Sequence, residues 1–95
     1  MDIEQLSQII GDKWQIQIIY YCGNEGLSFN ELQEKLKISR SVLTRKLNRL
    51  VSLNIIRREN ITAKFKKRAI YLISKEGNIF HKKIFELLLD SEPTY

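Results

Sequence analysis

The stretch Ser39–Leu53, SRSVLTRKLNRLVSL, has one apolar side and one polar side when it is drawn as a helix. Its apolar residues recur at positions i, i+4, i+7 and i+8: Leu43, Leu47, Leu50 and Val51. This spacing places them on a single helix face and predicts that the face meets a core. Ser39 is a good N-cap, and Asn54 readily ends a helix in the left-handed conformation. We therefore predict a helix from Ser39 to Leu53.

The polar side of this helix carries groups that hydrogen-bond base edges and phosphates. The residues predicted to contact DNA are Ser39, Arg40, Ser41, Thr44, Arg45, Asn48 and Arg49. The alternative is an ordinary solvated helix, which usually mixes Glu with Lys. No Asp or Glu lies between Lys35 and Arg58, so the sequence favours recognition of a polyanion.

A second, shorter helix is expected just upstream, in NELQEKL. Asn30 would cap it, and Gln33 three residues later resembles the partner in a capping box. The brief Lys37–Ile38 turn would join the two helices into a helix-turn-helix.

Two strands are expected after the helix-turn-helix, at Ile55–Thr62 and Arg68–Ile73. The loop Ala63–Lys67 between them is rich in lysine, and a basic hairpin in this place describes a wing that contacts flanking DNA. The wing residues predicted to bind phosphates are Lys64, Lys66, Lys67 and Arg68. The alternative is a hairpin tip kept soluble by its charge. Phe65 could pack back on the sheet, contact a partner subunit or stack on a sugar, and of these we expect packing on the protein.

Further helices are expected at Met1–Ile10, at Lys13–Cys22 behind an Asp12 cap, and from a Ser74 cap to Asp90. The last of these helices has two apolar stripes. A single small domain cannot easily bury both, so we predict a homodimer. The predicted interface residues are Ile3, Leu6, Ile10, Phe80, Ile84, Leu87 and Leu88. In the alternative, both stripes fold onto the domain's own core. Residues 92–95 are expected to form a loose tail.

Length and charge agree with a small nucleic-acid-binding protein. Ninety-five residues predict one domain over residues 1–95, mainly α-helical with a small β-hairpin, a winged helix-turn-helix. The net charge is +5, but it is segregated: residues 1–34 sum to −5, residues 35–83 to +13 and residues 84–95 to −3. A concentration of positive charge in one part of the chain is typical of proteins that bind nucleic-acid phosphates.

Other classes of protein find little support in the sequence. Cys22 is the only cysteine and His81 the only histidine, too few for a zinc site within one chain, and no catalytic motif or phosphate loop is present. We expect neither enzyme activity nor a metal or cofactor. The acidic N-terminus is unlike a signal peptide, and a cytoplasmic protein is expected.

Several segments together resemble the HxlR-type winged-helix transcription regulators, relatives of the MarR group. They are Ile10–Trp14, Leu27–Leu32, the Ile38–Leu50 stretch with its Leu43-Thr44 pair, and Ala69–Ser74 with Gly77, within about residues 9–88. The resemblance implies a homodimer that binds double-stranded DNA sequence-specifically, with its terminal helices paired and the Ser39–Leu53 helix in the major groove.

The chain departs from this family in one way that bears on regulation. Many members carry a cysteine ahead of the first segment, in some a redox sensor, whereas here no cysteine precedes Ile10. A small-molecule effector stays an open question. The alternative function is a winged helix that serves as a protein-interaction module in a transcription or replication assembly.

Overall fold

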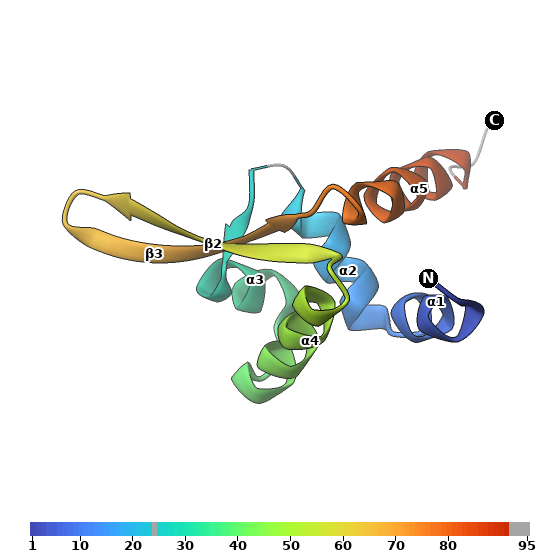
Figure 1. Cartoon of the computed structure of the whole chain (residues 1–95), viewed down its shortest axis with the longest axis horizontal. Coiled ribbons are helices and arrows are strands. Elements are labelled where there is room, and N and C mark those ends of the chain that lie inside the picture. The colour runs from blue at the N-terminus through green and yellow to red at the C-terminus, as the bar shows by residue number, and fades with distance from the viewer. Residues whose placement is uncertain (24, 92–95) are drawn as a thin grey trace.

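The computed structural model describes residues 1–23 and 25–91, which form five helices and three strands (Figure 1). In chain order they are α1 (Ile3–Ile10), α2 (Lys13–Cys22), β1 (Leu27–Ser28), α3 (Phe29–Leu36), α4 (Arg40–Ser52), β2 (Ile56–Ala63), β3 (Lys66–Ile73) and α5 (Gly77–Asp90). Helices α3 and α4 form the predicted helix-turn-helix, and the β2–β3 hairpin forms the predicted wing. The winged helix-turn-helix fold is confirmed.

The core lies between the helices and the start of the hairpin. Its buried apolar side chains are Ile9, Ile18, Ile19, Cys22, Leu32, Leu36, Leu43, Leu47, Leu50, Ile55, Ile56, Leu72 and Ile73. The three leucines of α4 are buried as predicted, but Val51 is 38% exposed and lies outside the core. Eight residues at about 100° each turn Val51 by about 80° from Leu43. It therefore sits at the edge of the apolar face.

The sheet is antiparallel, with β3 between β1 and β2. β2 and β3 pair along their whole length, from Ile56 opposite Ile73 to Ala63 opposite Lys66. β1 pairs only with Ile70 and Tyr71 of β3. The outer part of the hairpin is consequently a two-stranded ribbon that has no third strand beside it.

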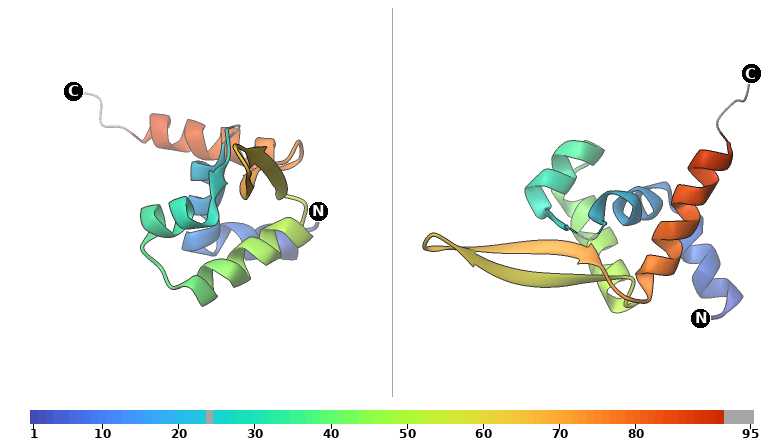
Figure 2. Two further views of the ribbon diagram at one scale, coloured as in Figure 1. Left: turned by 90° about the vertical axis from the view of Figure 1, so that its left-hand side faces the viewer. Right: turned by 90° about the horizontal axis from the view of Figure 1, so that it is seen from above.

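This ribbon projects from one end of the molecule, and α1 and α5 lie at the other end (Figures 1 and 2). The radius of gyration is 14.1 Å. A compact domain of this length is expected to have about 12 Å. The hairpin ribbon thus extends beyond the core.

The start of α3 differs from the prediction. Ser28, not Asn30, is the N-cap: its hydroxyl accepts a hydrogen bond from the Glu31 backbone N–H at 3.2 Å, and the Glu31 carboxylate accepts one from Ser28 N–H at 3.3 Å. Gln33 instead donates to the Ile38 carbonyl at 3.2 Å. The true capping box therefore begins two residues earlier, where β1 ends, and Gln33 stabilises the turn of the helix-turn-helix.

The predicted Ala63–Lys67 loop is much shorter in the structure. Both strands extend into it, and only Lys64 and Phe65 form the turn. Phe65 was expected to pack on the protein, but it is fully exposed. That prediction was wrong, because a residue at the tip of a projecting two-residue turn is beyond reach of the core.

The helix ends elsewhere follow their predicted caps. The Asp12 carboxylate accepts hydrogen bonds from the backbone N–H groups of Trp14 and Gln15, and the Ser39 hydroxyl accepts one from Val42 N–H. Asn54 takes the predicted left-handed conformation, with φ of 60°. These local signals place α2 and α4 correctly.

Helix α5 begins three residues after Ser74, so Glu76 and not the predicted Ser74 is its N-cap, although the Ser74 hydroxyl accepts a hydrogen bond from Gly77 N–H at 2.8 Å. Phe80 and Ile84 are half-buried against the core. The exposed apolar residues of this helix are Ile79, Phe85, Leu87, Leu88 and Leu89. Much of both predicted stripes is therefore exposed. The alternative, in which both stripes fold onto the domain's own core, is wrong. The predicted tail, residues 92–95, lies outside the described residues.

Candidate nucleic-acid interface

The polar face of α4 is open along its length. The exposed residues of this face, beginning with the N-cap, are Ser39, Arg40, Ser41, Thr44, Arg45 and Asn48. The Ser39 and Ser41 hydroxyls lie 3.3 Å apart at its start. Among the described residues, the Arg45 guanidinium has no ion-pair partner. Its charge and its donors are therefore available to a ligand.

The start of α3 lies beside this face, and the outer half of β3 lies beside the start of α3. The Arg40 guanidinium stacks over the Phe29 ring at 4.6 Å from the ring centroid. Phe29 in turn lines a hollow of about 420 Å³, whose other residues are Ser28, Asn30, Lys66, Lys67, Arg68 and Ala69. Three cations thus gather next to the N-terminus of α3, where the helix dipole also favours an anion.

Two residues predicted to bind phosphates have partners within the protein. Arg68 forms an ion pair with Glu31, and Arg49 donates a hydrogen bond to the Gln8 side chain of α1. Both arginines are exposed, so these contacts are open to solvent. The other wing lysines, Lys64, Lys66 and Lys67, are exposed too. Arg68 is therefore the wing cation whose charge is already balanced.

A contact that sequence reasoning missed ties α4 to α2. Lys46 forms an ion pair with Asp12, the cap of α2. Partial burial alone would raise the pKa of Asp12, but Lys46 and the backbone N–H groups of Gln15 and Trp14 outweigh it and lower that pKa. With the Arg49–Gln8 bond, this pair fixes α4 against α1 and α2 and orients its polar face. No local signal announces a pair 34 residues apart in sequence.

Cys22 is buried in α2, and burial raises the pKa of its thiol to about 12. Because the thiolate is the reactive form, the folded protein holds this cysteine protonated and unreactive near neutral pH. Within residues 1–23 and 25–91, the structure brings no three His, Cys, Asp or Glu side chains together as a metal site. Over the same residues, no helix is long and apolar enough to cross a membrane.

We expect native Cys22 to resist alkylation by iodoacetamide at pH 7.5, because its thiol is both buried and protonated. Mass spectrometry of the native protein and of the protein in guanidinium chloride measures this directly. The denatured chain should gain one adduct readily. Labelling of the native chain at the denatured rate would show that the thiol is accessible.

The predicted interface residues at the other end of the molecule differ in exposure. Ile3, Ile10, Leu87 and Leu88 are exposed, whereas Leu6 is half-buried, as Phe80 and Ile84 are. Ile10, Phe80, Ile84, Leu87 and Leu88 line an apolar groove of about 590 Å³, with Ile16, Lys83 and Ser91. The groove brings α1 and α5 onto one continuous apolar surface.

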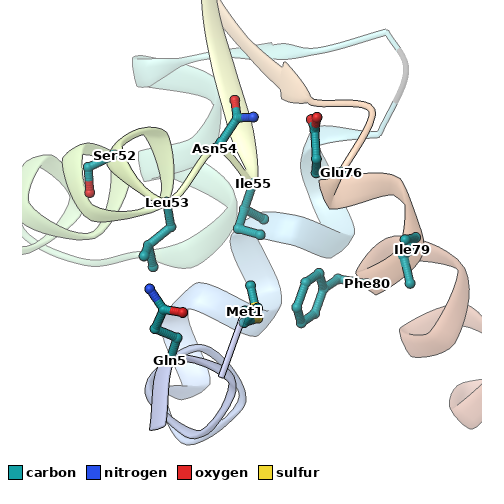
Figure 3. A pocket seen from close by; sticks show the side chains of 9 residues that line it. All are labelled: Met1, Gln5, Ser52, Leu53, Asn54, Ile55, Glu76, Ile79 and Phe80. Carbon is teal, nitrogen blue, oxygen red and sulfur yellow. The ribbon is translucent and has the colours of Figure 1, made fainter. Parts of the chain in front are cut away.

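A separate cavity of about 490 Å³ lies at the C-terminal end of α4 (Figure 3). Side chains from the N-terminus and α1, from the α4–β2 junction and from the start of α5 surround it: Met1, Gln5, Ser52, Leu53, Asn54, Ile55, Glu76, Ile79 and Phe80. It is at the opposite end of α4 from Ser39 and Arg40. We assign it no part in nucleic-acid contact.

Several solved structures share this fold. No curated protein matches the sequence. The reduced transcriptional regulator YodB from B. subtilis matches with a TM-score of 0.77 at 22% identity, over 92% of this chain and 85% of that chain. The redox regulator HypR in its oxidised form matches with a TM-score of 0.78 at 22% identity, over 98% of each chain.

A MarR-family regulator from Porphyromonas gingivalis W83 also matches, with a TM-score of 0.78 at 22% identity, over 92% of this chain and 85% of that chain. Likeness at these identities establishes the shared winged-helix fold. The HxlR-like helix-turn-helix family matches residues 9–90, which is most of the sequence. The chain therefore belongs to the HxlR-like helix-turn-helix family of transcription regulators.

Proposed function

We propose that this regulator binds double-stranded DNA sequence-specifically as a homodimer, with α4 in the major groove and the wing along the flanking backbone. The observation that carries the proposal is the open polar face of α4, which continues into the basic hollow between α3 and the wing. A helix with this face is the element that reads base edges in winged-helix proteins.

Each part of the surface has its own task in this proposal. The Arg45 guanidinium suits the two acceptors of guanine, and the Asn48 amide suits the donor and acceptor of adenine. Lys66 and Lys67 contact phosphates, which contribute affinity but little sequence preference. The Lys46–Asp12 pair binds no DNA and instead holds α4 at its angle.

The homodimer is proposed from the apolar surface of α1 and α5. Leu87 and Ile10, which line the groove of about 590 Å³, are 68% and 54% exposed, and Ile3 of α1 is 76% exposed. Soluble monomers rarely expose so many large apolar side chains next to one another. A two-fold contact through it would present two α4 helices to two half-sites.

The test is selection of bound duplexes from a random-sequence pool at roughly physiological salt, where non-specific electrostatic binding weakens. Enrichment of an inverted repeat with half-site centres about one helical turn apart supports the dimeric, sequence-specific binder. Retention without enrichment refutes sequence specificity. No retention of any duplex refutes DNA binding and favours the protein-interaction module, and sedimentation equilibrium separates the 11.3 kDa monomer from its dimer.

We expect Arg45→Ala to weaken binding of the selected duplex by about 1–3 kcal/mol and to relax sequence preference at one base pair. The guanidinium has no ion-pair partner in the described part of the protein, so its loss should leave stability nearly unchanged. Fluorescence anisotropy with the selected duplex and single-base variants measures both effects. Equal losses on selected and random duplexes would remove Arg45 from base readout.

We expect Lys66→Ala to weaken binding to all duplexes alike and to reduce the slope of log affinity against log salt by about one. Arg68→Ala is the matched control, because Glu31 already balances the Arg68 charge, so the salt slope should change less than it does in Lys66→Ala. The salt dependence of affinity therefore distinguishes Lys66→Ala from Arg68→Ala. A salt slope unchanged in Lys66→Ala would exclude a phosphate contact at Lys66.

A further inference from the structure

The tip of the wing holds an aromatic side chain in water. Phe65 is fully exposed, and no residue that the structure describes packs against it. It lies in the turn that joins β2 and β3, and Figure 1 shows this end of the hairpin far from α1 and α5. An exposed phenyl ring at a projecting tip contributes no buried area to the fold, and the whole ring is accessible to a partner.

The backbone of this turn is also unfavourable for the residues that form it. Lys64 and Phe65 have φ of 45° and 70°, the left-handed region at both positions of a two-residue hairpin turn. Such turns favour Asn-Gly, and a bulky residue with positive φ costs about 1 kcal/mol or more. A glycine at position 65 would therefore suit the hairpin better than phenylalanine does.

The charges around Phe65 indicate the kind of partner. Its neighbours Lys64, Lys66 and Lys67 are exposed cations, and the only acid in either strand, Glu59, pairs with Arg57 at 3.0 Å. An apolar ring rimmed by cations fits a polyanion that has an apolar interior. Base-paired DNA is such a polymer, since its phosphates surround stacked bases.

The hairpin is long enough to bring the ring there. Eight-residue strands span about 26 Å. One helical turn of DNA is about 34 Å, so neighbouring groove centres are about half that distance apart. A wing beginning beside α4 in the major groove therefore reaches the adjacent minor groove.

We propose that Phe65 is an apolar wedge that enters this minor groove and partly unstacks one base step, while the flanking lysines hold the phosphates on either side. Phenylalanine is among the residues that kink DNA in this way, and the kink lets the duplex contact more protein surface. The proposal rests on the proposed function, because it needs α4 to position the wing on duplex DNA.

The test compares Phe65→Gly and Lys64→Ala with the unchanged protein on the selected duplex, labelled at both ends for energy transfer and carrying 2-aminopurine in the flanking steps. Phe65→Gly should fold at least as stably, because glycine relieves the turn. It should bind about tenfold more weakly with an unchanged salt slope, and lose both the bend and the 2-aminopurine signal. Lys64→Ala should flatten the salt slope and keep the bend.

A Phe65→Gly protein with wild-type affinity and bend would overturn the wedge and leave the proposed function intact. Failure of the unchanged protein to bind any duplex would overturn the proposed function itself. Phe65-dependent sedimentation with vesicles of anionic phospholipid, together with full DNA affinity in Phe65→Gly, would assign the ring to a membrane surface and refute the wedge.

Discussion

Leu47→Ala is expected to cost about 2–5 kcal/mol of folding free energy, a large share of the about 5–15 kcal/mol that stabilises a domain of this kind. Leu47 is 1% exposed and packs in the core, where α4 contacts α2 and β2. Truncation removes buried methyl groups and leaves a cavity that close-packed neighbours fill poorly. The midpoint of urea unfolding, followed by circular dichroism, measures the loss.

Val51→Ala is the matched control, four residues later on the same helix. Val51 is 38% exposed, and alanine favours a helix more than valine does, so its effect should stay within about 0.5 kcal/mol. Both variants are compared at one protein concentration, because dimerisation makes stability depend on concentration. Equal losses at the two positions would mean that Val51 also lies in a core.

The contrast between these positions shows what periodicity predicts well. Leu43, Leu47 and Leu50 lie near the centre of the apolar face, and their burial follows from spacing alone. Val51 satisfies the same three- and four-residue steps but lies at the edge of the face. Whether an edge residue is buried depends on how closely the neighbouring helix approaches, which one sequence does not specify.

The candidate site also has one part that the sequence predicts and another that it does not. The polar face of α4 follows from helical spacing, because its members are neighbours in sequence. The Arg68–Glu31, Arg49–Gln8 and Lys46–Asp12 contacts do not, because each joins segments far apart in the chain. Phe65 was misjudged because hydrophobicity predicts burial, while the hairpin register places this residue at the tip.

Gly77→Ala is expected to destabilise the fold by about 3 kcal/mol, the upper end of the usual cost of overpacking. A Cβ atom on Gly77 would lie 1.8 Å from the Ile55 carbonyl oxygen and 2.8 Å from its carbon. That carbonyl cannot move away freely, since it accepts hydrogen bonds from Ser74 N–H at 3.0 Å and from the Ser74 hydroxyl at 2.9 Å. Relief of the clash therefore requires the start of α5 to separate from the start of β2.

The sign of this effect is what makes the measurement informative. Gly77 is helical, and on helix propensity alone alanine would be about 1 kcal/mol more favourable than glycine. Lys82→Ala, on the exposed surface of the same helix, controls for changes to α5 and should stay within about 0.5 kcal/mol. A higher unfolding midpoint for Gly77→Ala would show that α5 does not approach Ile55 so closely. A loss of stability in Gly77→Ala alone supports close packing of Gly77 against the Ile55 carbonyl. This packing would fix α5, and with it the proposed dimer surface, relative to the wing.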